Sequence, residues 1–395
     1  MSGASRQAAC TASGGRNRQK DRLAFLIYSA AELAGHSRLD PTMPRAMTHT
    51  QQPDPDLVCR HTTVDASSVA RWVTQHHGIA VQRCHLIRRG LNDNYALRAA
   101  DGGRYVARLY SIRPRGEFNA DFELALLAHL DGRGVGVAAP VPAADGRLHI
   151  RLRFPEGERA LALFRHAEGA TPEAPEEFEL TARTLALIHG AASDYAGPPS
   201  RYTLDGQHLA GRTLGYLETY PELEQEPELL ERYRGLVAGL LARLDAAEGG
   251  LTRVVCHGDT HGFNNHVHTD ASGTGQTRFF DFDDAGPGFL AYDLCVMPWS
   301  YLLRKGLKES DDTLRERWVH YLRGYRAGGG APSERDLAAL PLFIQLRHLW
   351  NLGEAAGRLH HWGTSSAPAS WLRKQLESFE AWDKLDFHPI QGASE

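Results

Sequence analysis

Residues 254–264 read VVCHGDTHGFN, and residues 279–288 read FFDFDDAGPG. In both stretches an apolar strand runs directly into a loop that is dense in polar side chains, and loops at strand ends commonly carry function. The first loop contains Asp259 and Asn264, and the second strand ends in Asp281. A hairpin that joins the two strands would bring Asp281 beside Asn264. The sequence therefore predicts that the two loops form one site.

The residue types at this site suit a metal-bound phosphate. A carboxylate and a carboxamide are the oxygen ligands that Mg²⁺ prefers, and water and substrate phosphate normally complete its shell. We therefore predict Asn264 and Asp281 as metal ligands. Phosphoryl transfer depends mainly on positioning and positive charge, so a metal on the phosphates and one carboxylate, Asp259, near the attacking hydroxyl are sufficient. Singly, such residues are more often turn and capping residues, but their joint occurrence at this spacing favours the functional interpretation.

The two stretches also carry a recognisable family pattern. The motif H-G-D-x-H-x-x-N, followed by F-D-F-D-D-A-G-x-G and then by Tyr292-Asp-Leu294, resembles the aminoglycoside phosphotransferase and choline kinase superfamily, which includes homoserine, methylthioribose and stress-response kinases. The resemblance covers roughly residues 80–385. It implies a protein-kinase-like fold and an ATP-dependent phosphotransferase that uses ATP and Mg²⁺.

The resemblance assigns roles to individual residues of the two stretches. Asp259 would be the catalytic residue that accepts or orients the proton of the attacking hydroxyl, while Asn264 and Asp281 would hold Mg²⁺ against the β- and γ-phosphates. His257 and Asp293 match the buried groups that fix the catalytic loop in this family.

The N-terminal half contains candidates for nucleotide binding. Gly90-Leu-Asn-Asp-Asn94 lies between two predicted strands and resembles the family's nucleotide loop, in which backbone N–H groups face phosphate oxygens. Taken alone, such a cluster is usually a plain turn. We predict nucleotide contacts at Gly90, Asn92 and Asn94. By resemblance, the connection between the lobes, Leu163-Phe-Arg165, would offer backbone hydrogen bonds to adenine, so Leu163 and Arg165 are included.

The positively charged residue that is expected to bind the phosphates differs from the one in the family pattern. Arg108 stands in a predicted strand where most relatives carry lysine, and no lysine occurs between Lys20 and Lys305. An arginine can still contact phosphate with two N–H groups, although its planar fork is wider than an ammonium group. We expect Glu123, on the helix fifteen residues later, to be its partner. The alternative is an exposed arginine and a solvated glutamate that contribute little.

The order of predicted elements indicates an α+β, bilobal fold. The N-terminal lobe is predicted to be antiparallel sheet plus one helix after a short leading helix at Ser67–His77, with strands at Leu86–Ile87, Tyr95–Ala100, Tyr105–Tyr110, Leu148–Leu152 and Ala160–Phe164 and the helix at Phe118–Leu130. The C-terminal lobe is predicted to be mainly helical, with helices at Phe178–Ala192, Pro227–Ala247, Leu290–Lys305, Asp311–Ala327, Glu334–Ala356 and Ser370–Lys384. We predict a disordered extension at 1–55, a nucleotide-binding lobe at 56–169 and a catalytic and acceptor-binding lobe at 170–388.

Composition excludes several classes of protein. The 395 residues include 44 Lys and Arg against 48 Asp and Glu, which is not the basic excess of a nucleic-acid binder. Five scattered cysteines read as the reduced thiols of a cytoplasmic protein. No apolar run approaches the roughly 18 residues that a membrane span needs. We therefore expect a cytoplasmic monomer or homodimer without nucleic-acid or membrane partners.

The sequence does not identify the hydroxyl-bearing small molecule that accepts the phosphoryl group. Residues 48–395 hold 37 Lys and Arg against 45 Asp and Glu, and this acidity mildly favours an amine-bearing alcohol. Asp283 and Asp284 are candidates to face its ammonium group, and homoserine-like, choline-like and aminoglycoside-like acceptors all stay open. A protein Ser/Thr kinase of the stress-response type is an alternative. A nucleotide-binding pseudokinase is another, suggested by Arg108 but weakened by the intact catalytic and metal-binding residues.

Overall fold

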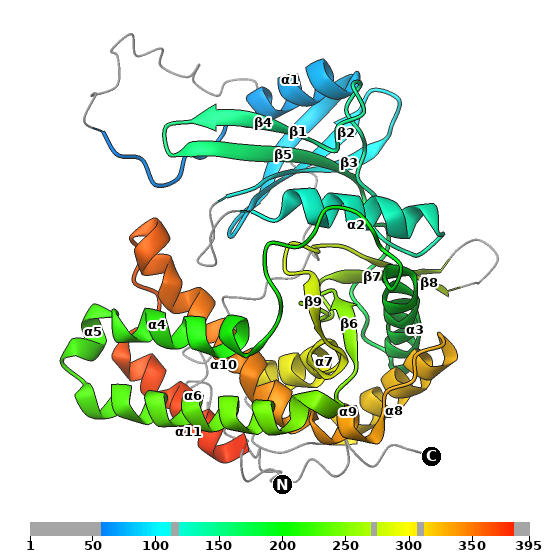
Figure 1. Ribbon diagram of the computed structural model, residues 1–395. Helices are drawn as coiled ribbons and strands as arrows, with labels where there is room; N and C mark the ends of the chain where they lie inside the picture. Colours follow the sequence, from blue (N-terminus) through cyan, green and yellow to red (C-terminus); the bar gives the residue numbers. More distant parts are fainter. Residues whose placement is uncertain (1–56, 112–117, 270–274, 306–311, 383–395) are drawn as a thin grey trace, which may run out of the picture.

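The computed structural model describes residues 57–111, 118–269, 275–305 and 312–382. The predicted extension at 1–55 lies outside these residues. Figure 1 shows two lobes, a five-stranded sheet formed by the N-terminal part and a mainly helical C-terminal part. This arrangement confirms the predicted α+β, kinase-like fold class. Among the described residues, no helix is both long and apolar enough to cross a membrane.

The N-terminal sheet is antiparallel throughout, in the order β1-β2-β3-β5-β4. Its strands are β1 (Val81–Arg89), β2 (Asp93–Ala99), β3 (Arg104–Leu109), β4 (His149–Phe154) and β5 (Gly157–Arg165). Helix α1 (Ala66–His77) packs on one face of the sheet through the buried Val69 and Val73. Helix α2 (Ala120–Gly132) lies between the sheet and the helical lobe, and its buried leucines belong to the core of that lobe. Both lobes are thus packed around apolar cores that meet near α2.

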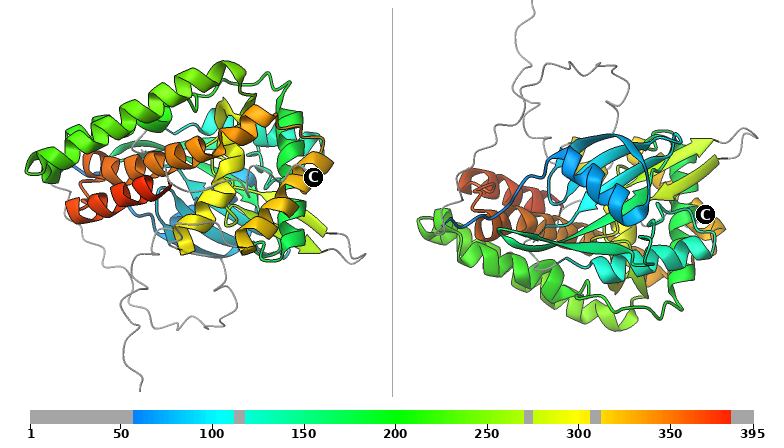
Figure 2. Two further views of the ribbon diagram at one scale, coloured as in Figure 1. Left: turned by 90° about the horizontal axis from the view of Figure 1, so that it is seen from below. Right: turned by 90° about the horizontal axis from the view of Figure 1, so that it is seen from above.

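The C-terminal lobe begins with α3 and is built mainly from long helices. Its helices are α3 (Pro175–Ala192), the π-helical turn η1 (Gln207–Gly211), α4 (Arg212–Glu218), α5 (Pro221–Glu224), α6 (Pro227–Ala247), the 3₁₀ turn η2 (Glu248–Gly250), α7 (Leu290–Lys305), α8 (Asp312–Ala327), α9 (Glu334–Ala338), α10 (Leu340–Trp362) and α11 (Ala369–Trp382). Figure 2 shows α6, α10 and α11 side by side in this lobe.

Two small sheets support the loops quoted from the sequence. Strand β7 (Asn265–Thr269) pairs with β8 (Gly275–Phe279), and β6 (Arg253–Cys256) pairs with β9 (Gly286–Phe289). The sequence predicted strands around Val254 and Phe280, separated by a Gly-rich turn and joined as a hairpin, and this pairing is wrong. The two strands are β6 and β8, and each pairs with a strand that the sequence did not reveal, β9 and β7 respectively. The turn itself, residues 270–274, lies outside the described residues.

The predicted helix Glu334–Ala356 is wrong as a single element. The structure breaks it into α9 and α10, with Ala339 between them. Pro341 occupies the first turn of α10, where its missing N–H costs nothing, and it cannot continue the preceding helix. As a result, α10 begins a separate axis and runs toward the N-terminal lobe (Figure 1).

Candidate active site

The predicted catalytic loop runs from His257 to Asn264, between β6 and β7. Gly258 has φ +87°, and a Cβ on it would lie 2.2 Å from the carbonyl oxygen of Asp284. Only glycine fits this conformation and this close approach, so the second residue of the motif is fixed by the backbone. The loop is therefore held directly against the segment that follows β8.

Two buried side chains fix the conformation of this loop. The Asp293 carboxylate accepts hydrogen bonds from the backbone N–H groups of His257 (2.7 Å) and Gly258 (2.8 Å), and it lies 2.9 Å from His189 Nε2. The His257 ring accepts from the Asp259 N–H at Nδ1 and donates from Nε2 to the Phe280 carbonyl, so its neutral form uses both nitrogens. Burial lowers the pKa of His257. The structure thus places both predicted structural residues at the loop.

The Asp259 side chain lies at the centre of the site and contacts three other side chains. One oxygen accepts a hydrogen bond from Arg347 Nη2, and the other accepts from Asn264 Nδ2 at 3.0 Å and lies 3.3 Å from His261 Nε2. Burial alone would raise the pKa of Asp259, but the positive charge of Arg347, with His261, holds it well below its usual range. Asp259 is therefore a carboxylate over the whole physiological pH range.

Arg347, on α10, is a residue of this site that the sequence did not identify. Its side chain is only 3% exposed and packs against the rings of Trp299 and Trp350, at 4.7 and 4.3 Å from the ring centres. Besides Asp259, it donates from Nη1 to the Gly258 carbonyl and to the Tyr292 hydroxyl, both at 3.0 Å. The only signal in the sequence was a basic residue among tryptophans, 88 residues from its partner.

Asn264 and Asp281 flank the same end of the β7–β8 hairpin, which is not the hairpin that the sequence predicted. Asn265 pairs with Phe279 in the β7–β8 ladder, and the Phe280 N–H donates to the Asn264 carbonyl at 3.0 Å. The Asn264 amide nitrogen also donates to the Asp259 backbone carbonyl, which leaves its Oδ1 as the atom suited to a metal. Asp281 has φ +69°. Among the residues that the structure describes, every other residue with a positive φ is a glycine. Strained residues such as Asp281 cluster at functional sites.

The electrostatics around Asp281 favour a bound cation. Burial raises the pKa of Asp281 to about 6 against the attraction of Arg108, and the neighbouring charges of Asp283 and Asp284 add to the shift, although 37% of its side chain stays exposed. Within the described ranges, no group of three or more His, Cys, Asp or Glu side chains is arranged to hold a metal ion. Asn264 and Asp281 would supply two oxygen ligands, and this set would suit a Mg²⁺ ion that takes its other ligands from water and phosphate.

Arg108 and Glu123 form the predicted pair, and it is buried. Arg108 Nη1 donates to Glu123 at 2.9 Å, and Nη2 lies 3.0 Å from Asp281. Asn94 accepts from Arg108 Nε at 3.3 Å, and the Tyr110 hydroxyl donates to the other Glu123 oxygen at 2.6 Å. Burial raises the pKa of Glu123 to about 7, partly offset by the charge of Arg108. The alternative of an exposed pair is wrong, and the arginine links the N-terminal sheet to the predicted metal ligand.

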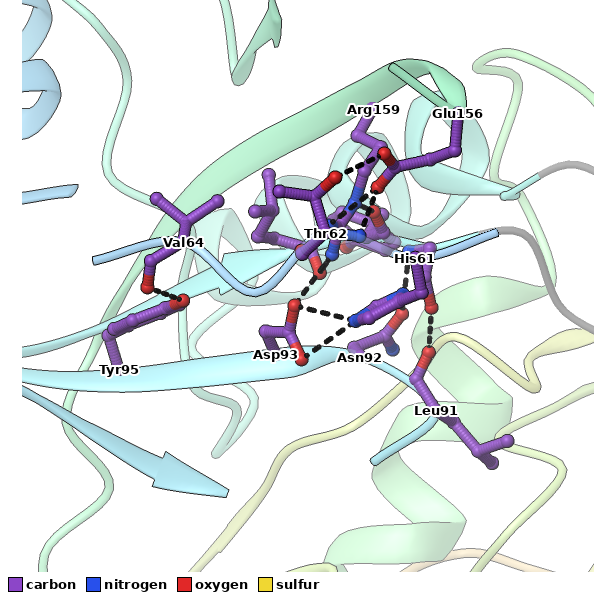
Figure 3. Close-up of polar contacts among 12 residues, drawn as sticks. His61, Thr62, Val64, Leu91, Asn92, Asp93, Tyr95, Glu156 and Arg159 are labelled. Atoms are coloured by element: carbon purple, nitrogen blue, oxygen red, sulfur yellow. Dashed lines mark hydrogen bonds and ion pairs between the residues drawn. The ribbon is translucent and has the colours of Figure 1, made fainter. Parts of the chain in front are cut away.

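The predicted nucleotide loop, Gly90 to Asn94, joins β1 to β2 and faces the segment after β8. Asn92 donates to the Asp283 carboxylate at 2.6 Å, so Asp283 points toward the N-terminal lobe. The next residue, Asp93, enters a buried polar cluster with Arg159, which Figure 3 shows. Gly90 donates its N–H to the Asn92 carbonyl, which closes the turn. The loop is therefore held by hydrogen bonds in two directions, from Asn92 to the segment after β8 and from Arg159 of β5 to Asp93.

Leu163 and Arg165 lie at the end of β5, beside the connection between the lobes. The Leu163 carbonyl accepts from the Val141 N–H at 2.7 Å, and the Arg165 N–H donates to the Ala139 carbonyl at 3.0 Å. Two of the backbone groups that could face adenine are thus used inside the fold. The Arg165 side chain is exposed. The adenine contacts stay a prediction, and these two hydrogen bonds argue against part of it.

The geometry described so far agrees with the comparison of the chain with known families. Residues 85–331 match the phosphotransferase enzyme family. The chain belongs to this family, and it is a phosphotransferase that acts on a hydroxyl group of a small molecule.

The chain is also similar to individual proteins and to solved structures. A protein of uncharacterised function from Deinococcus radiodurans is 34% identical over 82% of this chain and 92% of its own length. The homoserine kinase of Cupriavidus metallidurans is 30% identical over 83% and 94%, respectively. Among solved structures, an amicoumacin kinase in complex with AMP-PNP and Ca²⁺ has a TM-score of 0.64 at 21% identity, covering 83% of this chain and 97% of that chain. A microcompartment-associated aminopropanol kinase has a TM-score of 0.58 at 22% identity, covering 83% and 98%. These two structures support the fold.

Proposed function

We propose that this phosphotransferase is a kinase that transfers the γ-phosphoryl group of ATP, as its Mg²⁺ complex, to the hydroxyl group of a small amino-alcohol. The observation that carries the proposal is the convergence of Asp259, Asn264 and Asp281 at one end of the β7–β8 hairpin, with Arg108 reaching Asp281 from the sheet. In this proposal the nucleotide lies between an N-terminal lobe of residues 56–169 and a C-terminal lobe of residues 170–388.

Each residue of the site has a separate task in the proposed reaction. Bound by Asn264 and Asp281, a magnesium ion would neutralise charge on the β- and γ-phosphates. Arg108, held by Glu123, adds a permanent positive charge on the other side of the phosphates. Asp259 accepts a hydrogen bond from the acceptor hydroxyl and orients it for attack. Arg347 acts through Asp259 as a positioning residue, because it holds one carboxylate oxygen and leaves the other toward Asn264.

The acceptor is proposed to carry an amino group. Asp259, Asp281, Asp283 and Asp284 concentrate negative charge at the site, and this favours an ammonium group near the reacting hydroxyl. Asp283, which also accepts a hydrogen bond from Asn92, and Asp284, whose backbone lies against Gly258, are the candidates to face it. The homoserine kinase relatives and the aminopropanol kinase fold neighbour are consistent with an acceptor of this class.

The proposal is tested by a screen of amino-alcohols for acceptor-dependent ADP release with ATP and Mg²⁺. We expect turnover with at least one acceptor, a loss of about 10²-fold or more in Asp259→Asn, and unchanged turnover in the surface control Asp312→Asn. Full turnover in Asp259→Asn would contradict the catalytic assignment. Incubation with labelled ATP without acceptor separates this reading from a protein kinase, because only the latter labels the chain itself.

A further inference from the structure

A short segment before α1, residues 60–64, runs between the nucleotide loop and the last turn of α10 (Figure 1). We propose that Arg60, His61 and Thr62 form a strap that positions the nucleotide loop relative to the C-terminal lobe, and that Arg60 and His61 are positioning residues for nucleotide binding. The inference rests on the proposed role of the loop at residues 90–94 toward the nucleotide. Its structural part stands on contacts that do not depend on that role.

The strap meets the loop at a buried ion pair. Asp93 is fully buried and Arg159 is 1% exposed, and Arg159 Nη2 donates to the Asp93 carboxylate at 2.8 Å. The same guanidinium donates to the backbone carbonyls of Tyr110 and Thr62, at 2.7 and 2.8 Å. A buried pair of this kind is rigid, because loss of either partner leaves an uncompensated charge. The first residue of β2 is therefore fixed in place.

Residues of the strap complete this cluster from outside the sheet, as Figure 3 shows. His61 Nε2 lies 3.1 and 3.3 Å from the two Asp93 oxygens. The N–H and the hydroxyl of Thr62 donate to the two oxygens of Glu156, at 2.8 and 2.6 Å. Glu156 lies 3.4 Å from Arg159. Both carboxylates around the arginine are thus bound by consecutive residues of the strap, which ties the loop to the β4–β5 turn.

The other side of the strap contacts the C-terminal lobe. Arg60 Nη1 donates to the His360 carbonyl at 2.9 Å, and the His61 ring lies 6.5 Å from that of Trp362. Both contacts are in the last turn of α10. The same helix carries Arg347, which holds the Asp259 carboxylate. A continuous chain of contacts therefore runs from the nucleotide loop through the strap to the helix that positions the catalytic aspartate.

This arrangement predicts a specific kinetic effect. Without the His61 ring, Asp93 keeps Arg159, so the sheet stays folded, but the nucleotide loop loses its direct contact with the strap. Hydrogen bonds to charged groups correspond to a change of about 10-fold in an equilibrium constant. We expect His61→Ala to raise the KM and Kd for ATP by about 5- to 10-fold and to leave kcat at saturating ATP and the acceptor KM within about twofold. Arg60→Ala acts in the same direction with a smaller effect, because its contact is exposed.

The experiment compares these variants with matched controls in the full chain. His85→Ala and Arg98→Ala remove exposed residues of the same types from β1 and β2. ADP release gives kcat and KM, calorimetric titration with ATP gives Kd, and hydrogen exchange reports protection of residues 90–99. His61→Gln, which restores a donor to Asp93, is expected to return the KM for ATP to within about twofold of the wild type. Thermal unfolding confirms that each variant is folded.

The outcomes separate the strap from the proposed function. An increase in the KM for ATP in His61→Ala, absent in His85→Ala and reversed in His61→Gln, supports the proposal. Equal KM values for His61→Ala and His85→Ala overturn it. If the wild type itself neither binds nor turns over ATP, the proposed function fails, and hydrogen exchange still decides the structural part. Unchanged protection of residues 90–99 in His61→Ala then overturns the strap.

Discussion

Arg347 is the residue whose replacement tests the arrangement of the catalytic loop most directly. Its guanidinium makes hydrogen bonds to Asp259, to the Gly258 carbonyl and to the Tyr292 hydroxyl, and its side chain is 3% exposed. Arg347→Met keeps much of the side-chain volume between the tryptophan rings but removes the charge and all three contacts. Arg347→Lys keeps the charge, but a single ammonium group cannot reproduce the planar fork.

The expected magnitudes follow from these contacts. Breaking a buried ion pair costs about 3–5 kcal/mol, but Asp259 is 17% exposed and keeps Asn264, so we expect Arg347→Met to lower the free energy of unfolding by about 2 kcal/mol. Correct placement of a general base is worth about 10²–10⁴-fold, so kcat is expected to fall by about 10²-fold in Arg347→Met and about 10-fold in Arg347→Lys. The KM for ATP is expected to change by less than about twofold, since Arg347 does not touch the predicted nucleotide site.

The assay is acceptor-dependent ADP release, combined with thermal unfolding of each variant. The matched control is Arg373→Met, which removes a surface arginine paired with Glu226 and is expected to cost at most about 1 kcal/mol without loss of kcat. A folded Arg347→Met enzyme with kcat within twofold of the wild type would refute the positioning role. A large rise in the KM for ATP with unchanged kcat would also refute it, because it would move the effect to the nucleotide.

Three further predictions concern the nucleotide cation, the catalytic loop and acid stability. Arg108→Lys is expected to keep kcat/KM for ATP within about 10-fold of the wild-type value, because the positive charge is retained. Arg108→Gln removes the charge and is expected to lower kcat/KM for ATP by about 10²-fold. ADP release measures kcat/KM for both variants. Gly258→Ala, whose new Cβ would meet the Asp284 carbonyl, is expected to abolish turnover and lower the melting temperature far more than Gly134→Ala, which has φ +74° and open space around it. Burial lowers the pKa of His348 to about 4, so the unfolded chain binds the proton first and stability is lost as the pH falls from about 6.5 to 4. The loss reaches about 3 kcal/mol and is expected to be smaller in His348→Gln, as pH-dependent unfolding would show; equal acid sensitivity would contradict this.

The sequence predicted elements whose signals are local. Helix α6 has the predicted bounds, Pro227–Ala247, because a proline marks its first turn and an apolar stripe runs along it. The β7–β8 hairpin was predicted only in part, because the polar residues of β7, which reads Asn-His-Val-His-Thr, give little strand signal and the hairpin was assigned to β6 instead. The turn η1 and α4 were missed, since three glycines between residues 206 and 215 weaken any helical pattern. The structure shows tight packing there, with Thr213 closely approached by Gly353 of α10.

The same distinction applies to the site. The sequence pointed to Asp259, Asn264 and Asp281 because they stand close together in one dense motif. It pointed to the Arg108–Glu123 pair because the two residues are only fifteen positions apart. It did not point to Arg347, because the contact of Arg347 with Asp259 depends on how α10 packs in the folded lobe. The link from Asn92 to Asp283 crosses 191 positions and likewise requires the fold. Partners that are distant in sequence leave no periodic pattern that could reveal them.

The arginine at position 108 has a practical consequence for chemical proteomics. Nucleotide-site probes commonly work by acylating a lysine amine near the phosphates, and a guanidinium group is far less reactive because it stays protonated. The chain has no lysine from residue 21 to 304, a range that contains the whole N-terminal sheet and the catalytic loop. An amine-directed ATP probe is therefore expected to find no lysine to acylate in the N-terminal sheet or in the loop from His257 to Asn264, and Arg108→Lys would supply one.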